Sequence, residues 1–117
     1  MITEDYVSFE IAKLLKEKEF KCDSLHYYYD KDGDLFFSAL RADVGKNEFV
    51  TPTLQMAMKW LREVHKIFIS IQQHMDMSYV WYIYEDGTLK GCDRESHNNS
   101  YEQACEEAIK YCLENLI

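Results

Sequence analysis

The sequence predicts an α+β protein in which an antiparallel sheet, built from two Asp-Gly hairpins, carries about three helices packed on it. Asp32-Gly33 and Asp86-Gly87 each separate two aromatic-rich runs. Asp-Gly between apolar runs is a strong hairpin signal, because a type I′ turn needs positive φ at both central residues. Three further stretches have the spacing of amphipathic helices. A chain of 117 residues can bury one core, so residues 1–117 are expected to form a single domain.

The first helix is expected to start near Thr3 and to end near Glu19. Glu4 and Asp5 lie in its first turn, where the helix dipole favours negative charge. Its apolar residues recur at the i, i+4, i+7 and i+8 spacing of a helix with one buried face. They are Val7, Ile11, Leu14 and Leu15.

Strands are expected over residues 25–29 and 35–39, on either side of Asp32-Gly33, with a short strand over 48–50. The second helix is predicted to follow at once, with Thr51 as its N-cap and Pro52 as its first residue. It is expected to close at His65-Lys66, and its predicted buried stripe is Leu54, Ala57, Met58, Leu61 and Val64.

The next three isoleucines, at 67, 69 and 71, alternate with other residues and predict a half-buried strand. Residues 73–78 are expected to turn. Residues 79–84 are apolar or aromatic on both faces, which favours a central strand or one covered by a partner. Asp86-Gly87 then leads into a strand over 88–92.

The last helix is expected to open with a capping box, in which Ser100 and Gln103 each satisfy a free backbone N–H. Each of the two predicted Asp-Gly hairpins is thus followed by a predicted helix. This repetition suggests a pseudo-repeat of one hairpin–helix unit. The predicted core stripe of this helix is Tyr101, Ala104, Cys105, Ala108, Cys112 and Leu116, with Ile109 beside it.

The formal net charge is −8. Nucleic acid backbones and anionic membranes require clustered Lys and Arg, so neither is an expected partner. An acidic mimic of nucleic acid is disfavoured because the acids are interleaved with lysines. No apolar run approaches the roughly 20 residues of a membrane span.

Four cysteines are present, and no signal peptide is recognised ahead of them. Cys105 and Cys112 are seven apart on a helix, about 10.5 Å along its axis, which is too far for a disulfide. The expectation is reduced thiols in a cytoplasmic protein.

The segment Asp30–Asp34 matches the opening of an EF-hand calcium loop. Such a loop needs Gly at its sixth position and Glu at its twelfth, where this chain has Leu35 and Arg41. Strands rather than helices are predicted on both sides, so a hairpin turn is the better interpretation. Cys92 and His97 share one loop, and a zinc site there would need ligands from elsewhere. No metal or other cofactor is predicted.

Signs of catalysis are few. There is no G-x-S-x-G elbow and no Gly-rich phosphate loop, and nothing near Cys92 is seen to activate its thiol. Glu106 and Glu107 are adjacent carboxylates, but successive helical residues point about 100° apart, so a solvated face is expected.

The remaining signal is aromatic. Trp60, Trp81, Tyr82 and Tyr84 are rings of the kind that anchor interfaces, and the alternative is that they are ordinary core. Trp60 lies about 95° from the centre of the predicted stripe, which makes it the better candidate for a contact outside the core. If residues 79–84 lie at a sheet edge or on an uncovered face, they would drive homodimerisation.

Three helical blocks, Ile2–Lys18, Thr53–His65 and Ala108–Ile117, resemble a family of small uncharacterised proteins from gut bacteria and their phages or mobile elements. The resemblance covers about a third of the chain and implies a small α+β domain of unknown function, with no catalytic or ligand residues. The C-terminal third, in which Ser100–Ala104 opens a helix after a hairpin, is similar to HicB-type antitoxins, although no DNA-binding segment is present.

The function expected from these observations is a non-enzymatic cytoplasmic module for protein–protein interaction, with a protein partner or self-association. The alternative is a small-ligand or HicB-antitoxin-like binding module. An enzyme is the third hypothesis.

Overall fold

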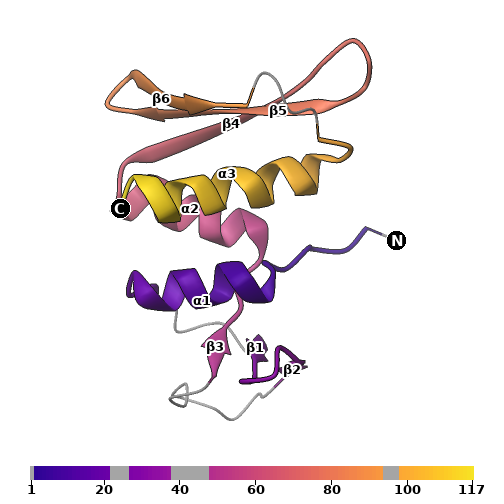
Figure 1. The fold of residues 1–117 in the computed structure, drawn as a ribbon, viewed down its shortest axis with the longest axis vertical. Coiled ribbons are helices and arrows are strands. Elements are labelled where there is room, and N and C mark those ends of the chain that lie inside the picture. The colour runs from indigo at the N-terminus through magenta and orange to yellow at the C-terminus, as the bar shows by residue number, and fades with distance from the viewer. Residues whose placement is uncertain (1, 22–26, 38–47, 94–97) are drawn as a thin grey trace.

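The structure is a computed structural model that describes residues 2–21, 27–37, 48–93 and 98–117. In these residues, three helices lie between two antiparallel sheets of three strands each (Figure 1). The α+β class is therefore confirmed. The single sheet expected from the sequence is wrong, because the two hairpins belong to different sheets on opposite sides of the helices.

Helix α1 (Phe9–Glu17) begins later than the predicted Thr3. Ser8 is the N-cap, and its hydroxyl oxygen accepts the N–H of Ile11 at 3.3 Å. The preceding segment is extended because it pairs with another part of the chain. Tyr6 forms a β-bridge with Thr53, and the N–H of Val7 donates to the carbonyl of Pro52 at 3.0 Å.

The smaller sheet has the order β2-β1-β3, from β1 (Tyr27–Tyr29), β2 (Leu35–Phe37) and β3 (Phe49–Val50). The predicted strand residues 25, 26, 38 and 39 lie outside the described residues. In the β1–β2 turn, the Asp30 carboxylate accepts the N–H groups of Asp32 and Asp34, both at 2.9 Å. Only Gly33 of the Asp32-Gly33 pair has positive φ, so this turn lacks the predicted type I′ geometry.

Helix α2 (Leu54–Val64) is capped by Thr53, whose hydroxyl oxygen accepts the N–H of Met56 at 3.1 Å. The prediction of Thr51 as the cap is wrong. The N–H of Thr51 donates to the carbonyl of Tyr27 at 2.8 Å, so Thr51 continues the small sheet. Val64, predicted to be buried, is 58% exposed at the last turn.

The larger sheet has the order β4-β5-β6, from β4 (Ile67–Gln73), β5 (Tyr79–Glu85) and β6 (Thr88–Cys92). β5 is the central strand. Asp86 and Gly87, between β5 and β6, both have positive φ, at 52° and 76°. Both central residues of this turn thus have the sign of φ that a type I′ turn requires.

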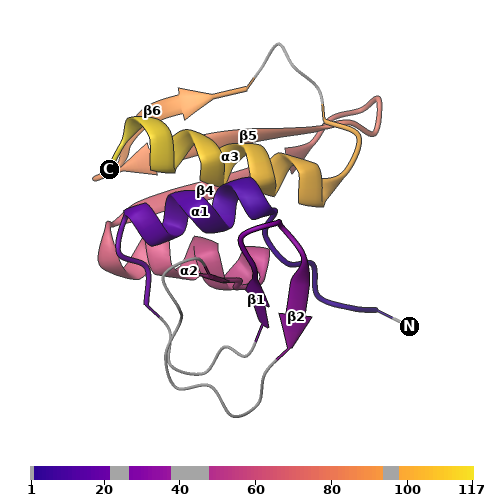
Figure 2. The same cartoon turned by 60° about the horizontal axis from the view of Figure 1, so that its bottom comes forward.

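Helix α3 (Tyr101–Asn115) begins after Ser100, whose hydroxyl oxygen accepts the N–H of Gln103 at 3.1 Å. It packs against β4 and β5, while α2 packs against β4 and α3, and α1 packs against α3 and β3. Figure 2 shows α2 on the β4 side of α3. The main core therefore lies between α2, α3 and one face of the larger sheet. A common origin of the two hairpin–helix units stays a prediction.

Candidate protein-interaction surface

The larger sheet has one covered face and one open face. Side chains alternate along a strand, and the odd-numbered residues of β4 and β5 face the helices. Ile67, Trp81 and Ile83 belong to the core, and Ile69, Ile71 and Tyr79 pack against it. All three helices lie on one side of this sheet (Figure 1). By the same alternation, the even-numbered residues point to the opposite face. We call the side that they form the outer face.

A row of apolar side chains crosses the outer face. Phe68 of β4 pairs with Tyr84 of β5, and Tyr84 pairs with Leu89 of β6. Phe68 is 53% exposed and Leu89 42% exposed, and Tyr84 between them is half-buried. We call these three residues the outer row. Val80 on the same face is fully buried, so the open part of the face is the end that carries the outer row.

A second row lies beside the first. Tyr82 pairs with Ser70 on one side and with Cys92 on the other. Neither row contains a charged residue, although the protein carries a net charge of −8. Because the centres of protein interfaces are depleted in charged side chains, this composition is typical of a contact surface.

The structure separates the four aromatic residues selected from the sequence. Tyr82 and Tyr84 lie on the outer face. Trp81 lies on the opposite face, is only 7% exposed, and packs its ring 5.2 Å from that of Tyr111. Trp81 is therefore part of the core, and its indole Nε1 is buried with no hydrogen-bond partner in the part of the chain described.

Trp60 lies on α2, in the helical layer and away from the outer face. Its ring contacts Phe20 at 5.3 Å and His65 at 4.6 Å, measured between centroids. With Lys21 and Lys59 it lines a shallow groove of about 170 Å³. Trp60 thus belongs to a separate surface and does not extend the outer row.

Phe68 and Leu89 were not selected from the sequence. The alternation of residues 67–71 placed Phe68 opposite three isoleucines and would have identified it as the outward residue. Leu89 gives no such signal, because a β-bulge shifts the β5–β6 register beside Tyr84.

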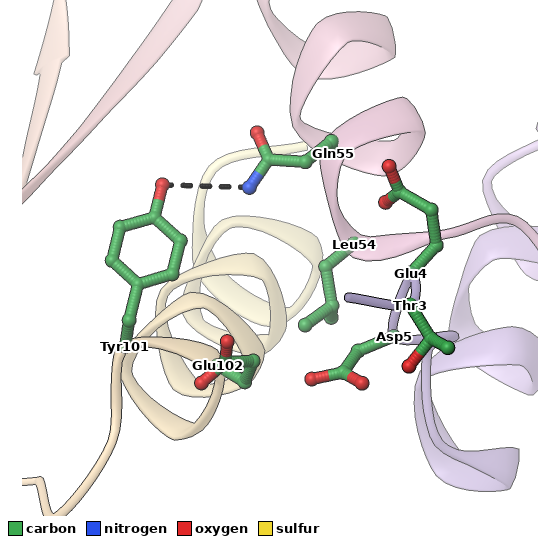
Figure 3. Close-up of a pocket in the computed structure, with 7 residues that line it drawn as sticks. All are labelled: Thr3, Glu4, Asp5, Leu54, Gln55, Tyr101 and Glu102. Atoms are coloured by element: carbon green, nitrogen blue, oxygen red, sulfur yellow. Dashed lines mark hydrogen bonds between the residues drawn. The ribbon is translucent and has the colours of Figure 1, made fainter. Parts of the chain in front are cut away.

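A small acidic pocket lies at the start of α2, at the opposite end of this helix from the groove beside Trp60. Figure 3 shows side chains from three segments around Leu54, and three of them are the carboxylates of Glu4, Asp5 and Glu102. The first turn of α2 has no acidic residue of its own. Carboxylates near a helix N-terminus are stabilising, so their placement here has a structural explanation. The pocket volume is about 80 Å³.

The cysteines differ in exposure. Cys105 and Cys112 are buried on α3, whereas Cys92 is exposed on β6. Cys22 and His97 lie outside the described residues, so the predicted Cys92–His97 pairing is not described. In the ranges that the structure covers, no group of three His, Cys, Asp or Glu side chains could hold a metal ion.

The prediction that Glu106 lies on a solvated face is wrong. Its carboxylate is half-buried and accepts the backbone N–H of Ser8 at 2.9 Å, whereas Glu107 is exposed. Burial raises the pKa of Glu106, while the Ser8 N–H acts in the opposite direction. The contact is explained by the packing of α3 on α1.

The chain matches no protein-family model, and comparisons with curated proteins and with solved structures found no match either. The resemblance to small proteins of gut bacteria and phages therefore stays a prediction. None of the described helices is long and apolar enough to cross a membrane.

Proposed function

We propose that this protein is a non-enzymatic module that binds another protein through the outer face of the β4–β5–β6 sheet. The observation that carries the proposal is the outer row, in which Phe68 and Leu89 are exposed on either side of Tyr84 with no helix above them. Contiguous exposed apolar patches on soluble proteins commonly mark interaction sites, and aromatic side chains are frequent anchors in them.

The charge distribution supports a protein as the partner. The outer row and the row beside it contain no charged residue while the whole chain carries a net charge of −8, and nucleic acid binding would need a basic patch. The apolar chemistry of this face supports a binding role and is the basis for proposing a non-enzymatic module. A cytoplasmic location belongs to the same proposal.

The alternative of a small-ligand or HicB-antitoxin-like module has less support. The groove beside Trp60 and the acidic pocket have volumes of about 170 and 80 Å³. Pockets for small molecules usually measure about 300 to 1,000 Å³.

Site-specific photocrosslinking in the native host tests the proposal. A benzophenone amino acid is placed at Tyr84, and in a matched control at Phe37, which is 57% exposed on the smaller sheet. A discrete protein adduct from position 84 that is absent from position 37 is expected. Adducts of equal yield at both positions, or none at 84, would contradict a role of the outer face.

A further inference from the structure

The two edges of the larger sheet differ in their protection. β6 is short, carries Lys90, and has a bulge opposite Ile83 and Tyr84. The carbonyl of Lys90 also accepts the hydroxyl of Tyr111 at 3.3 Å. Bulges and lysines are devices that keep an edge strand from pairing with another chain.

β4 forms the other edge and has none of these devices. Its seven residues, Ile67–Gln73, contain no charged side chain and no proline. They pair with β5 in one continuous register. Long, flat and uncharged edge strands are the ones that accept a further strand.

The backbone groups on this edge are available for pairing. At the mouth of the hairpin, the N–H of His74 donates to the carbonyl of Ser78 at 2.8 Å. Ladder hydrogen bonds alternate along an antiparallel pair, so Ser70 bonds to β5 while the N–H and C=O of Ile69 and Ile71 point away from it. Among the residues described, no backbone hydrogen bond outside the ladder reaches Ile69 or Ile71.

The helical layer extends beyond β4. α3 packs on β4 and β5, and α2 packs on β4 and on α3 (Figure 2). Packed helices lie about 8–10 Å apart and neighbouring strands about 4.8 Å apart, so α2 reaches beneath the position of the next strand. Ile69 and Ile71, which face this layer, are only half-buried, whereas Ile67 is buried.

This arrangement favours an isolated extended segment, and not a second copy of the chain, as the occupant of the β4 edge. Two β4 strands paired antiparallel about a two-fold axis would place both helical layers on the same side of the joined sheet. The α3 helix of the second copy lies beneath that copy's own β4 and β5. It would therefore occupy the space that α2 of the first copy already fills. An extended segment without helices beneath it meets no such obstacle.

The side chains beside the edge indicate the charge of the occupant. The Gln55 amide donates to the Tyr101 hydroxyl at 3.4 Å, and the Tyr101 ring lies 6.3 Å from that of Tyr79. This side of α2 therefore faces the start of α3, where Tyr101 lies beside Tyr79 of β5. Arg62 lies about two turns further along the same side and is exposed. Lys66 directly precedes β4, and its ammonium donates to the carbonyl of Glu63 at 2.9 Å.

We propose that the β4 edge binds an extended segment of a partner protein, with alternating apolar residues and an acidic end beside the start of β4. The segment adds a fourth strand beside β4. Its inward side chains cover Ile69 and Ile71, and its carboxylates meet Arg62 and Lys66. This site adjoins the outer face but uses backbone groups, so it does not depend on the contacts of the outer row.

The probe for the test is a synthetic peptide of alternating valine and threonine, as long as β4, with a pair of glutamates at each end. Amide hydrogen exchange of the labelled protein is followed by NMR during titration. The expected result is slower exchange at Ile69 and Ile71, with no change at Ser70, which already bonds to β5. Absence of protection at millimolar peptide would overturn the proposal.

Matched peptides test the strand geometry. N-methylation of one alternate set of peptide amides is expected to abolish binding, and methylation of the other set to preserve it, because only one set faces β4. Equal binding of the two methylated peptides would overturn the proposal. Protection of Ile69 and Ile71 without peptide, together with a dimer in sedimentation, would also overturn the proposal. That result would show that a second copy of the chain occupies the β4 edge.

Variants test the charge and separate this site from the outer face. Arg62→Glu is expected to weaken the binding of the glutamate-flanked peptide about five-fold. This factor corresponds to the upper range of the free energy of an exposed ion pair. Lys31→Glu, exposed in the distant β1–β2 turn, is the control and is expected to change nothing. Tyr84→Ser is expected to leave peptide binding intact even though it removes part of the outer row. Equal weakening by both charge reversals would contradict the proposed edge site.

Discussion

The carboxylate of Glu106 accepts the backbone N–H of Ser8, with N–O distances of 2.9 and 3.4 Å to its two oxygens. Ser8 caps α1, and Glu106 lies in the middle of α3. Next to this contact, the Tyr29 hydroxyl donates to the carbonyl of Val7 at 2.9 Å. Residues from α1, α3 and the smaller sheet thus meet at one half-buried carboxylate.

This contact is expected to make stability depend on pH. Burial raises the pKa of Glu106 above its usual 4.5, so the folded state takes up a proton more readily than the unfolded state. Ionised Glu106 therefore lowers stability at neutral pH, and this effect disappears as the pH falls through the folded pKa toward 4.5. Glutamine can still accept from Ser8 but carries no charge. The stability of Glu106→Gln relative to wild type should accordingly decrease from neutral to mildly acidic pH in urea titrations. A constant difference would contradict this account.

The ring of Tyr111 is expected to leave no room for a side chain at position 91, which Gly91 occupies. A Cβ atom at position 91 would lie 2.7 Å from a carbon of that ring. The ring also packs on Trp81 and bonds to Lys90, so it cannot move freely. Gly91→Ala should lower the free energy of unfolding by about 1–3 kcal/mol.

A double-mutant cycle checks the cause. In a Tyr111→Ala background, most of the cost of Gly91→Ala should vanish. Gly87→Ala is the control, because φ is +76° there and no atom lies within 4 Å of its Cβ position. Its cost of about 1 kcal/mol comes from the backbone and should persist without Tyr111. An unchanged Gly91→Ala cost in that background would rule out the ring contact.

Truncation should cost far more stability at Trp81 than at Tyr84. Trp81→Ala opens a cavity in the core and should destabilise by about 3–5 kcal/mol. Trp81→Phe keeps a ring and removes the unpaired indole N–H, so its cost should fall well below that of alanine. Tyr84→Ser, on the open face, should change stability by less than about 1 kcal/mol. Thermal and urea unfolding of the three variants measure this order, and a larger loss from Tyr84→Ser than from Trp81→Ala would refute the assignment of faces.

Cys105 and Cys112 should resist alkylation in the folded protein. Burial raises the pKa of Cys105 to about 11 and that of Cys112 to about 12, so the reactive thiolate is scarce at mildly alkaline pH. Iodoacetamide followed by peptide mapping should modify exposed Cys92 and leave the other two intact until urea is added. Native labelling of Cys112 as fast as that of Cys92 would show that this face of α3 is open to solvent.

Local signals were sufficient for several elements. Ser100 caps α3, residues 88–92 form β6, and the alternation of 67, 69 and 71 describes β4. Each of these depends on interactions between residues close in sequence or on a simple period, so the sequence contains the whole cause.

Long-range pairing decided the element boundaries that were predicted wrongly. Thr51 and Thr53 are both acceptable caps by residue type, but the N–H of Thr51 bonds to Tyr27 and leaves Thr53 as the cap. In the same way, the Tyr6–Thr53 bridge keeps the first segment extended and moves the start of α1 to Phe9. Composition near these residues gives no sign of either partner.

The sequence by itself determined the α+β class, because strongly apolar strands and amphipathic helices have distinct periods. For residues 79–84 it left a central strand and a strand covered by a partner as alternatives, and the sheet order shows that β5 is central. The tertiary structure alone decided that Trp81 is core while Tyr82 and Tyr84 face outward. Both faces of β5 are aromatic, so its pattern is the same whichever face the helices cover. It also decided that the hairpins form separate sheets and that β4 is an edge, because strand neighbours depend on contacts between distant segments.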